Sequence, residues 1–95
     1  MLRENDNDPQ RDPVILALAA LAATLGSERR AQRFVDMTGI GTGELRRRAA
    51  EPALLAALLR FLEAHEPDLL EVAEAIGAKP NDLVEARTRL EEGTT

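Results

Sequence analysis

Short apolar segments, each preceded by a helix-starting residue and followed by a helix-ending one, constrain the fold of this chain more than any other feature. Ala and Leu supply 31 of the 95 residues, whereas Tyr, Trp and Cys are absent. Because strands favour β-branched and aromatic residues, this composition disfavours a sandwich or a barrel. The lack of cysteine also excludes a disulfide scaffold, a cysteine zinc site and cysteine catalysis.

Helix start and stop signals predict six short helices and no strand. Asp12 before Pro13 begins the first helix, Ser27 caps the second, and Thr42 is expected to cap the third. Pro52, Pro67 and Pro80 begin the other three, while Gly26, Gly39 and Gly77 end helices. The predicted helices cover about residues 14–25, 28–38, 43–50, 52–65, 67–76 and 80–92.

The length of the chain suits one domain with a single core. Residues 1–12 are polar and lack the apolar segment of a signal peptide, so we expect a disordered leader there. A single helical domain is predicted over residues 13–92, with a flexible tail over 93–95. The longest apolar run, Pro13–Leu25, is too short to span a bilayer. With 31% charged residues and a net charge of −5, the chain is predicted to be cytoplasmic, with no membrane contact.

An offset of 38 residues aligns the first three predicted helices with the last three. Leu16-Ala17 falls on Leu54-Leu55, Phe34-Val35 on Val72-Ala73, and Gly39-Ile40 on Gly77-Ala78. This similarity predicts a duplicated three-helix unit, in which the most apolar helices, 14–25 and 52–65, lie at the centre of a pseudo-twofold bundle. Because helices rich in alanine and leucine align easily with one another, chance similarity is the alternative.

Basic residues gather in the middle of the chain. Residues 27–50 carry six arginines against three acids, whereas residues 51–95 carry ten acids against four bases. The candidate binding residues are Arg29, Arg30, Arg33, Arg46, Arg47 and Arg48. Guanidinium groups clustered in this way would bind a phosphate, a nucleic acid or an acidic protein. The alternative is a solvated face with the last three paired to the acidic half. Three consecutive arginines span about 200° of a helix, so at least one should project freely.

Both halves of the repeat also resemble a helix-turn-helix. In the second half, small or apolar residues stand at the positions that the motif requires: Val72, Ala73, Ile76, Gly77, Leu83 and Ala86. Its recognition helix, however, would repel phosphate, because it presents Asn81, Asp82, Glu85, Arg87 and Arg89 and is followed by Glu91 and Glu92. In the first half, Arg48 stands where the motif places an inward apolar residue. Hairpins used only for packing explain both halves, and nucleic-acid binding is the less favoured alternative.

No group of residues in the sequence indicates catalysis or metal binding. His65 is the only histidine; we place it at the C-terminus of the helix over 52–65, where a cation is favoured, and no ligand partner stands at the required spacing. The acidic residues Glu66, Asp68, Glu71 and Glu74 are interpreted as a solvated outer stripe. The glycine-rich segment 39–43 lacks the lysine and the strand of a phosphate-binding loop. We therefore expect neither an enzyme nor a bound cofactor or metal.

The middle of the chain is similar to a known family. The residues that carry the similarity are Thr38-Gly39-Ile40, Leu45-Arg46, Ala49, Pro52, Leu55, Leu59 and Phe61-Leu62. They resemble a family of small all-helical proteins of unknown function from alphaproteobacteria, and the similarity extends from about Val14 to Leu90. The use of 11 arginines against one lysine is similar to proteins of such GC-rich genomes. The resemblance implies a short cytoplasmic helical domain and supplies no catalytic or binding residues.

The sequence therefore predicts an all-α, compact bundle of six short helices that acts as a non-catalytic protein-interaction or regulatory module. The expected partner is a protein, of acidic character if the arginines bind it. Apolar surface left open by the helices over 14–25 and 52–65 predicts a symmetric homodimer. A nucleic-acid-binding regulator that uses the region from Arg29 to Arg48 is the alternative.

Overall fold

Asp12 begins the first helix as the sequence predicts. In the computed structural model, which describes residues 12–93, its carboxylate accepts hydrogen bonds from the backbone amides of Val14 and Ile15 at 2.9 and 3.2 Å. Pro13 follows in the first turn of α1 (Pro13–Leu25). Asp12 is the one residue of the predicted leader that is described; residues 1–11 and 94–95 lie outside the described range.

Glycine or proline stands at many of the ends of the remaining helices. These are α2 (Glu28–Thr38), α3 (Thr42–Arg47), α4 (Pro52–Glu63), α5 (Glu66–Ala75) and α6 (Pro80–Gly93). Gly39 and Gly77 adopt φ angles of +76° and +73° after α2 and α5, a left-handed conformation that favours glycine. The described residues thus form six helices and no strand, and the predicted all-α class is confirmed.

The predicted boundaries of two helices are wrong. The third helix begins at Thr42, with Gly41 rather than Thr42 at the N-cap, and it ends at Arg47 instead of continuing to about residue 50. The fourth ends at Glu63, because Pro67 has no amide hydrogen to donate to the carbonyl of that residue. His65 consequently lies at the N-cap of α5 in extended backbone and not within the C-terminus of α4.

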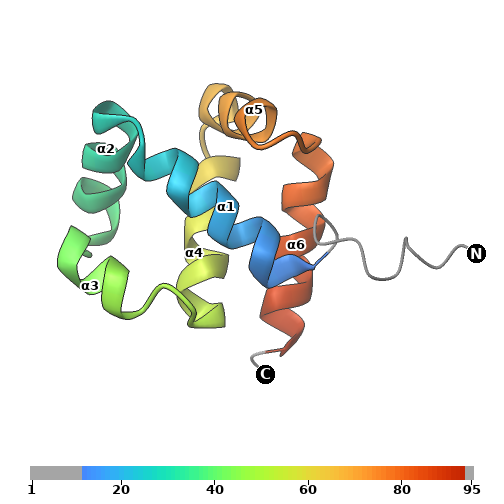
Figure 1. Ribbon diagram of the computed structural model, residues 1–95, viewed down its shortest axis with the longest axis horizontal. Helices are drawn as coiled ribbons and strands as arrows, with labels where there is room; N and C mark the ends of the chain where they lie inside the picture. Colours follow the sequence, from blue (N-terminus) through green and yellow to red (C-terminus); the bar gives the residue numbers. More distant parts are fainter. Residues whose placement is uncertain (1–11, 94–95) are drawn as a thin grey trace, which may run out of the picture.

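The core lies where α1, α4 and α6 pack together (Figure 1). Helix α4 contributes the most to it, with Leu54, Leu55, Ala56, Leu58, Leu59, Phe61 and Leu62 all buried. Helix α1 crosses α4, α6 lies on one side of this pair, and α2 and α3 lie on the other (Figure 1). None of the helices in residues 12–93 combines the length and the apolar character needed to cross a membrane.

The predicted pseudo-twofold arrangement does not extend to the third helix of each half. Helix α6 packs along both α1 and α4, whereas α3 lies at the edge of the bundle (Figure 1). The physical reason is length: the 14 residues of α6 place Leu83, Ala86 and Leu90 in the core, while the six residues of α3 place only Leu45 there. The centre of the bundle is therefore a three-helix unit drawn from both halves of the chain.

Candidate interaction site

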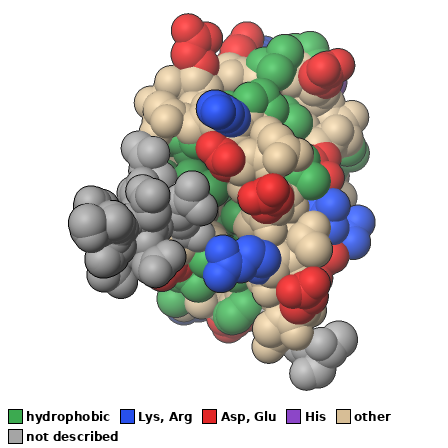
Figure 2. Space-filling model, turned by 90° about the vertical axis from the view of Figure 1, so that its right-hand side faces the viewer, with side chains coloured by type: hydrophobic (Ala, Val, Ile, Leu, Met, Phe, Trp, Pro, Cys, Tyr) green, Lys and Arg blue, Asp and Glu red, His purple; other side chains and the backbone are tan. Residues whose placement is uncertain are grey.

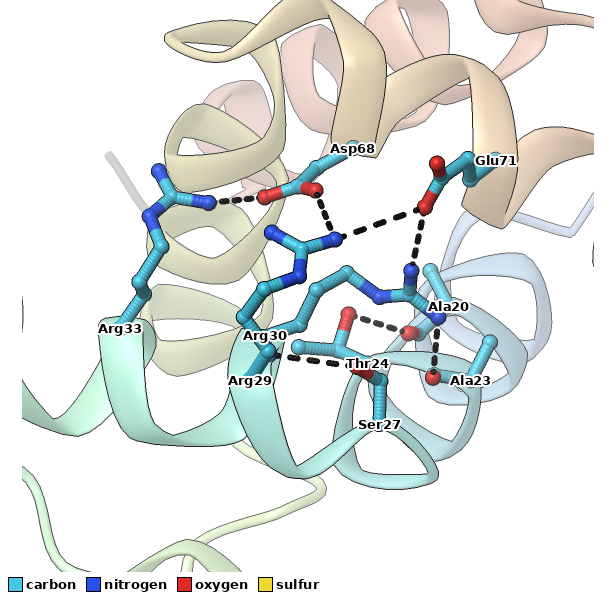
Figure 3. A network of polar contacts seen from close by, with 9 residues as sticks. All are labelled: Ala20, Ala23, Thr24, Ser27, Arg29, Arg30, Arg33, Asp68 and Glu71. Atoms are coloured by element: carbon cyan, nitrogen blue, oxygen red, sulfur yellow. Dashed lines mark hydrogen bonds and ion pairs between the residues drawn. The ribbon is translucent and has the colours of Figure 1, made fainter.

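Helix α2 presents three of the six candidate arginines to α5. Arg29 and Arg33 both pair with Asp68, and the distance from Arg29 Nη2 to Asp68 Oδ1 is 3.5 Å (Figure 3). Glu71, one turn further along α5, lies 2.7 Å from Nη1 of Arg30 and 3.7 Å from Nη2 of Arg29. These contacts form one network between two helices that are more than 30 residues apart in the sequence.

Asp68 is fully buried, and its placement in a solvated outer stripe is wrong. Its position explains the burial: it lies four residues before Val72 on α5, and residues spaced by four share one face of a helix. An isolated carboxylate in this position would be strongly unfavourable, so the two arginines compensate its charge. The hydrophobic periodicity of α5, extended back by one turn, is the sequence signal that could have identified it.

Arg30 joins three helices. Its guanidinium donates to Glu71 of α5 and, at 3.3 Å, to the carbonyl oxygen of Ala23 in the last turn of α1. A cation is favourable there because the last carbonyl groups of a helix carry partial negative charge. The side chain is only 13% exposed, and its buried Nε has no hydrogen-bond partner among the described residues. Arg30 is therefore part of the packing between α1, α2 and α5.

Aromatic side chains also contact this network. The guanidinium carbon of Arg33 lies 5.0 Å from the centre of the Phe61 ring, a distance at which a cation and a ring attract. Phe34 of α2 meets the same ring edge-to-face, with 5.2 Å between the ring centres. Phe61 belongs to α4, so α2 is held both to α5 by charge and to α4 by its single buried side chain, Phe34.

The three consecutive arginines at residues 46–48 differ in whether they form ion pairs. Arg48 donates to Glu51 and Glu44, each at 2.8 Å, and these hydrogen bonds, that to Glu51 first, raise the pKa of its guanidinium. Arg46 and Arg47 are exposed and form no ion pair within residues 12–93. Two of the six candidate arginines thus keep the free guanidinium groups that the spacing of three consecutive residues predicts.

A hollow lies between α2 and the start of α3. It is lined by Glu28, Arg29, Ala31, Gln32, Val35 and Thr42, which belong to α2 and the start of α3. Thr42 precedes Arg46 by four residues, so both lie on the same face of α3. This hollow was not predicted, although the half-buried Ala31 and Val35, also four residues apart, are the signal for it.

Helices α5 and α6 both pack against α1 and α4. Helix α6 is covered by α1 and α4 on its apolar side, and its exposed positions include Asn81, Glu85, Arg89 and Glu92. Arg87 is paired to Glu63 at 2.6 Å, which ties α6 to α4. Figure 2 views the side of the molecule that carries α6, and acidic side chains are distributed over it with basic ones between them. Such a surface does not attract phosphate.

The described residues contain no group of three or more His, Asp or Glu side chains that could hold a metal ion. Fold and site together define a small all-helical domain with a basic region that is partly paired within the chain. Residues 10–93 match the family model described as "Protein of unknown function (DUF3572)", and the chain belongs to this family. No curated protein and no solved structure matches it.

Proposed function

We propose that this protein is a non-catalytic interaction module that binds an acidic segment of a partner protein through Arg46 and Arg47. The observation that carries this proposal is the contrast within the basic region: four of its arginines are paired to carboxylates of the same chain, whereas these two are exposed and unpaired within residues 12–93. A guanidinium group presents a rigid set of donors that suits a carboxylate.

The hollow beside Arg46 supports a protein partner. Its floor of Ala31 and Val35 offers apolar contact next to the charged groups, a combination found at protein interfaces. Nucleic-acid binding is less favoured, because the net charge of the chain is −5 and α6, the better candidate for a recognition helix, exposes acidic residues. The resemblance to alphaproteobacterial proteins and the charged composition support a place in the bacterial cytoplasm.

The test compares two double variants that remove the same charge. Arg46→Ser with Arg47→Ser removes the proposed contact, and Lys79→Ser with Arg89→Ser, on exposed positions of the α5–α6 side, is the matched control. Binding of a labelled glutamate-rich peptide is measured by fluorescence anisotropy, with a labelled DNA duplex in parallel. We expect the Arg46 and Arg47 variant to bind the peptide about tenfold more weakly than the wild type and the control, and its free energy of unfolding to change by less than about 1 kcal/mol.

Equal peptide binding by all three proteins would show that Arg46 and Arg47 are not the contact. Marked destabilisation of their variant while binding is intact would show that the two arginines are structural. Tighter binding of the duplex, lost in the same variant and weakening steeply between about 50 and 200 mM salt, would establish the nucleic-acid alternative instead.

A further inference from the structure

We infer that α2 and α3 form an arm that opens from the bundle, and that Asp68 and Glu71 of α5 are the latch that holds it closed through the arginines of α2. The arm comprises residues 28–47. It is bounded by the turn at Gly26-Ser27 before α2 and by the turn over residues 48–51 after α3, so both of its ends are breaks between helices.

The apolar packing of the arm is thin. Phe34 is the one buried residue of α2 and Leu45 the one buried residue of α3, whereas α4 alone buries seven. Because burial of apolar side chains is the main stabilising contribution, a segment that buries few of them opens at a lower free energy than the centre of the bundle. Helices α1, α4 and α6, which pack against one another, form that centre.

Ion pairs with α5 hold the arm, which buries few apolar side chains. Three arginines of the arm reach across to two carboxylates of α5, with Arg30 to Glu71 at 2.7 Å and Arg29 to Asp68 at 3.5 Å. Asp68 is fully buried beneath the arm, so opening would separate its ion pairs and bring water to it. The same movement would free the α2 arginines and uncover the ring of Phe61.

A second ion-pair network in the same molecule provides the comparison. Arg87 pairs with Glu63 and Arg60 with Glu91, which joins α6 to α4. These two helices already share the most extensive packing in the bundle. Loss of a carboxylate in this network should therefore release no element, although its chemistry is the same.

Native-state hydrogen exchange of the full chain tests the latch. In the wild type, we expect the amides of α2 and α3 to exchange faster than those of α4 and α6. Asp68→Asn keeps the shape of the side chain and removes its charge; it should raise exchange in α2 and α3 by about tenfold or more and leave α4 and α6 within about twofold. The matched control, Glu63→Gln, should not single out α2 and α3.

Glu71→Gln covers the case in which the buried substitution prevents folding, because Glu71 is 57% exposed and the glutamine oxygen can still accept the hydrogen bond from Arg30. It should raise exchange in the same two helices by about threefold. Equal protection of α2, α3 and α4 in the wild type would overturn the inference. So would an increase spread evenly over all helices in the Asp68 variant, or no increase in either variant.

Discussion

At the scale of single residues, the role of a charged side chain here depends on which side chains it contacts. Asp68 stands in an acidic run, yet it is fully buried and paired with two arginines of α2. Arg46 and Arg48 stand two residues apart in one basic run, yet only Arg48 is paired within residues 12–93. Their contacts therefore divide the candidate arginines into those paired within the fold and those, Arg46 and Arg47, whose guanidinium groups can bind a partner.

Glu91 provides a prediction at this scale. The hydrogen bond from Arg60 is the largest cause, ahead of that from Arg87, of a pKa below the ordinary value for this carboxyl. A carboxylate whose pKa is lower in the folded state stabilises the fold above the pKa of the unfolded chain, and this contribution is lost as pH falls through the folded value. Between about pH 5 and pH 3, urea unfolding of Glu91→Gln should therefore show a weaker loss of stability than the wild type.

The control for this prediction is Glu74→Gln, which removes an exposed carboxylate of α5. It should leave the acid dependence close to that of the wild type. Identical pH profiles for the Glu91 variant and the wild type would show that the network of Arg60, Arg87 and Glu91 does not contribute to the acid sensitivity of the fold.

At the scale of elements, helices begin or end near glycine and proline, which change the conformations open to the backbone. Gly39 ends α2 with a positive φ, and Pro52 begins α4 directly after a residue in extended backbone. Between them, α3 forms over six residues. Its N-terminus has no side-chain hydrogen bond, because Gly41 stands at the N-cap. Gly39 thus sets the turn after α2, whereas Gly41 leaves the N-terminus of α3 without a side-chain cap.

The same replacement at these two glycines should have opposite effects. Gly39→Ser forces a side chain into φ +76° and should lower the free energy of unfolding by about 1 kcal/mol. Gly41→Ser, at φ −76° with open space around it, supplies the missing cap and should raise it by about 0.5 kcal/mol. Chemical denaturation measures both. Equal losses would mean that the serine side chain, and not backbone conformation, decides the outcome.

At the scale of the whole molecule, the bundle leaves one side of α1 uncovered by described residues. This helix carries no charged residue over its 13 positions, and Ile15 is 48% exposed on it. Helix α4, by contrast, buries most of its apolar residues. The open apolar surface predicted for both helices is therefore found mainly on α1. An exposed apolar surface of this kind is typical of an interface.

A homodimer through α1 is the corresponding prediction. Twofold pairing is the commonest closed assembly, and a helix about 20 Å long gives a small contact, so we expect a weak dimer at about 100 μM and monomers on dilution. Ile15→Glu should abolish the dimer in sedimentation equilibrium. Leu70→Glu, which places the same charge at a 47% exposed leucine of α5, should not. A wild-type monomer at high concentration, or loss of the dimer in the control alone, would contradict this interface.

The sequence by itself determined the all-α class and the start or end of most helices. Asp12, Ser27 and Gly39 act on the backbone within a few residues of their own positions, so their effects can be read locally. Tertiary structure alone decided that α6 lies at the centre and α3 at the edge, that Asp68 is buried, and which arginines of α2 pair with α5. The burial of Asp68 and the pairing of the α2 arginines depend on contacts between residues 35 to 41 positions apart, such as Arg33 with Asp68 and Arg30 with Glu71. No local pattern records such contacts, because they form only when the helices pack.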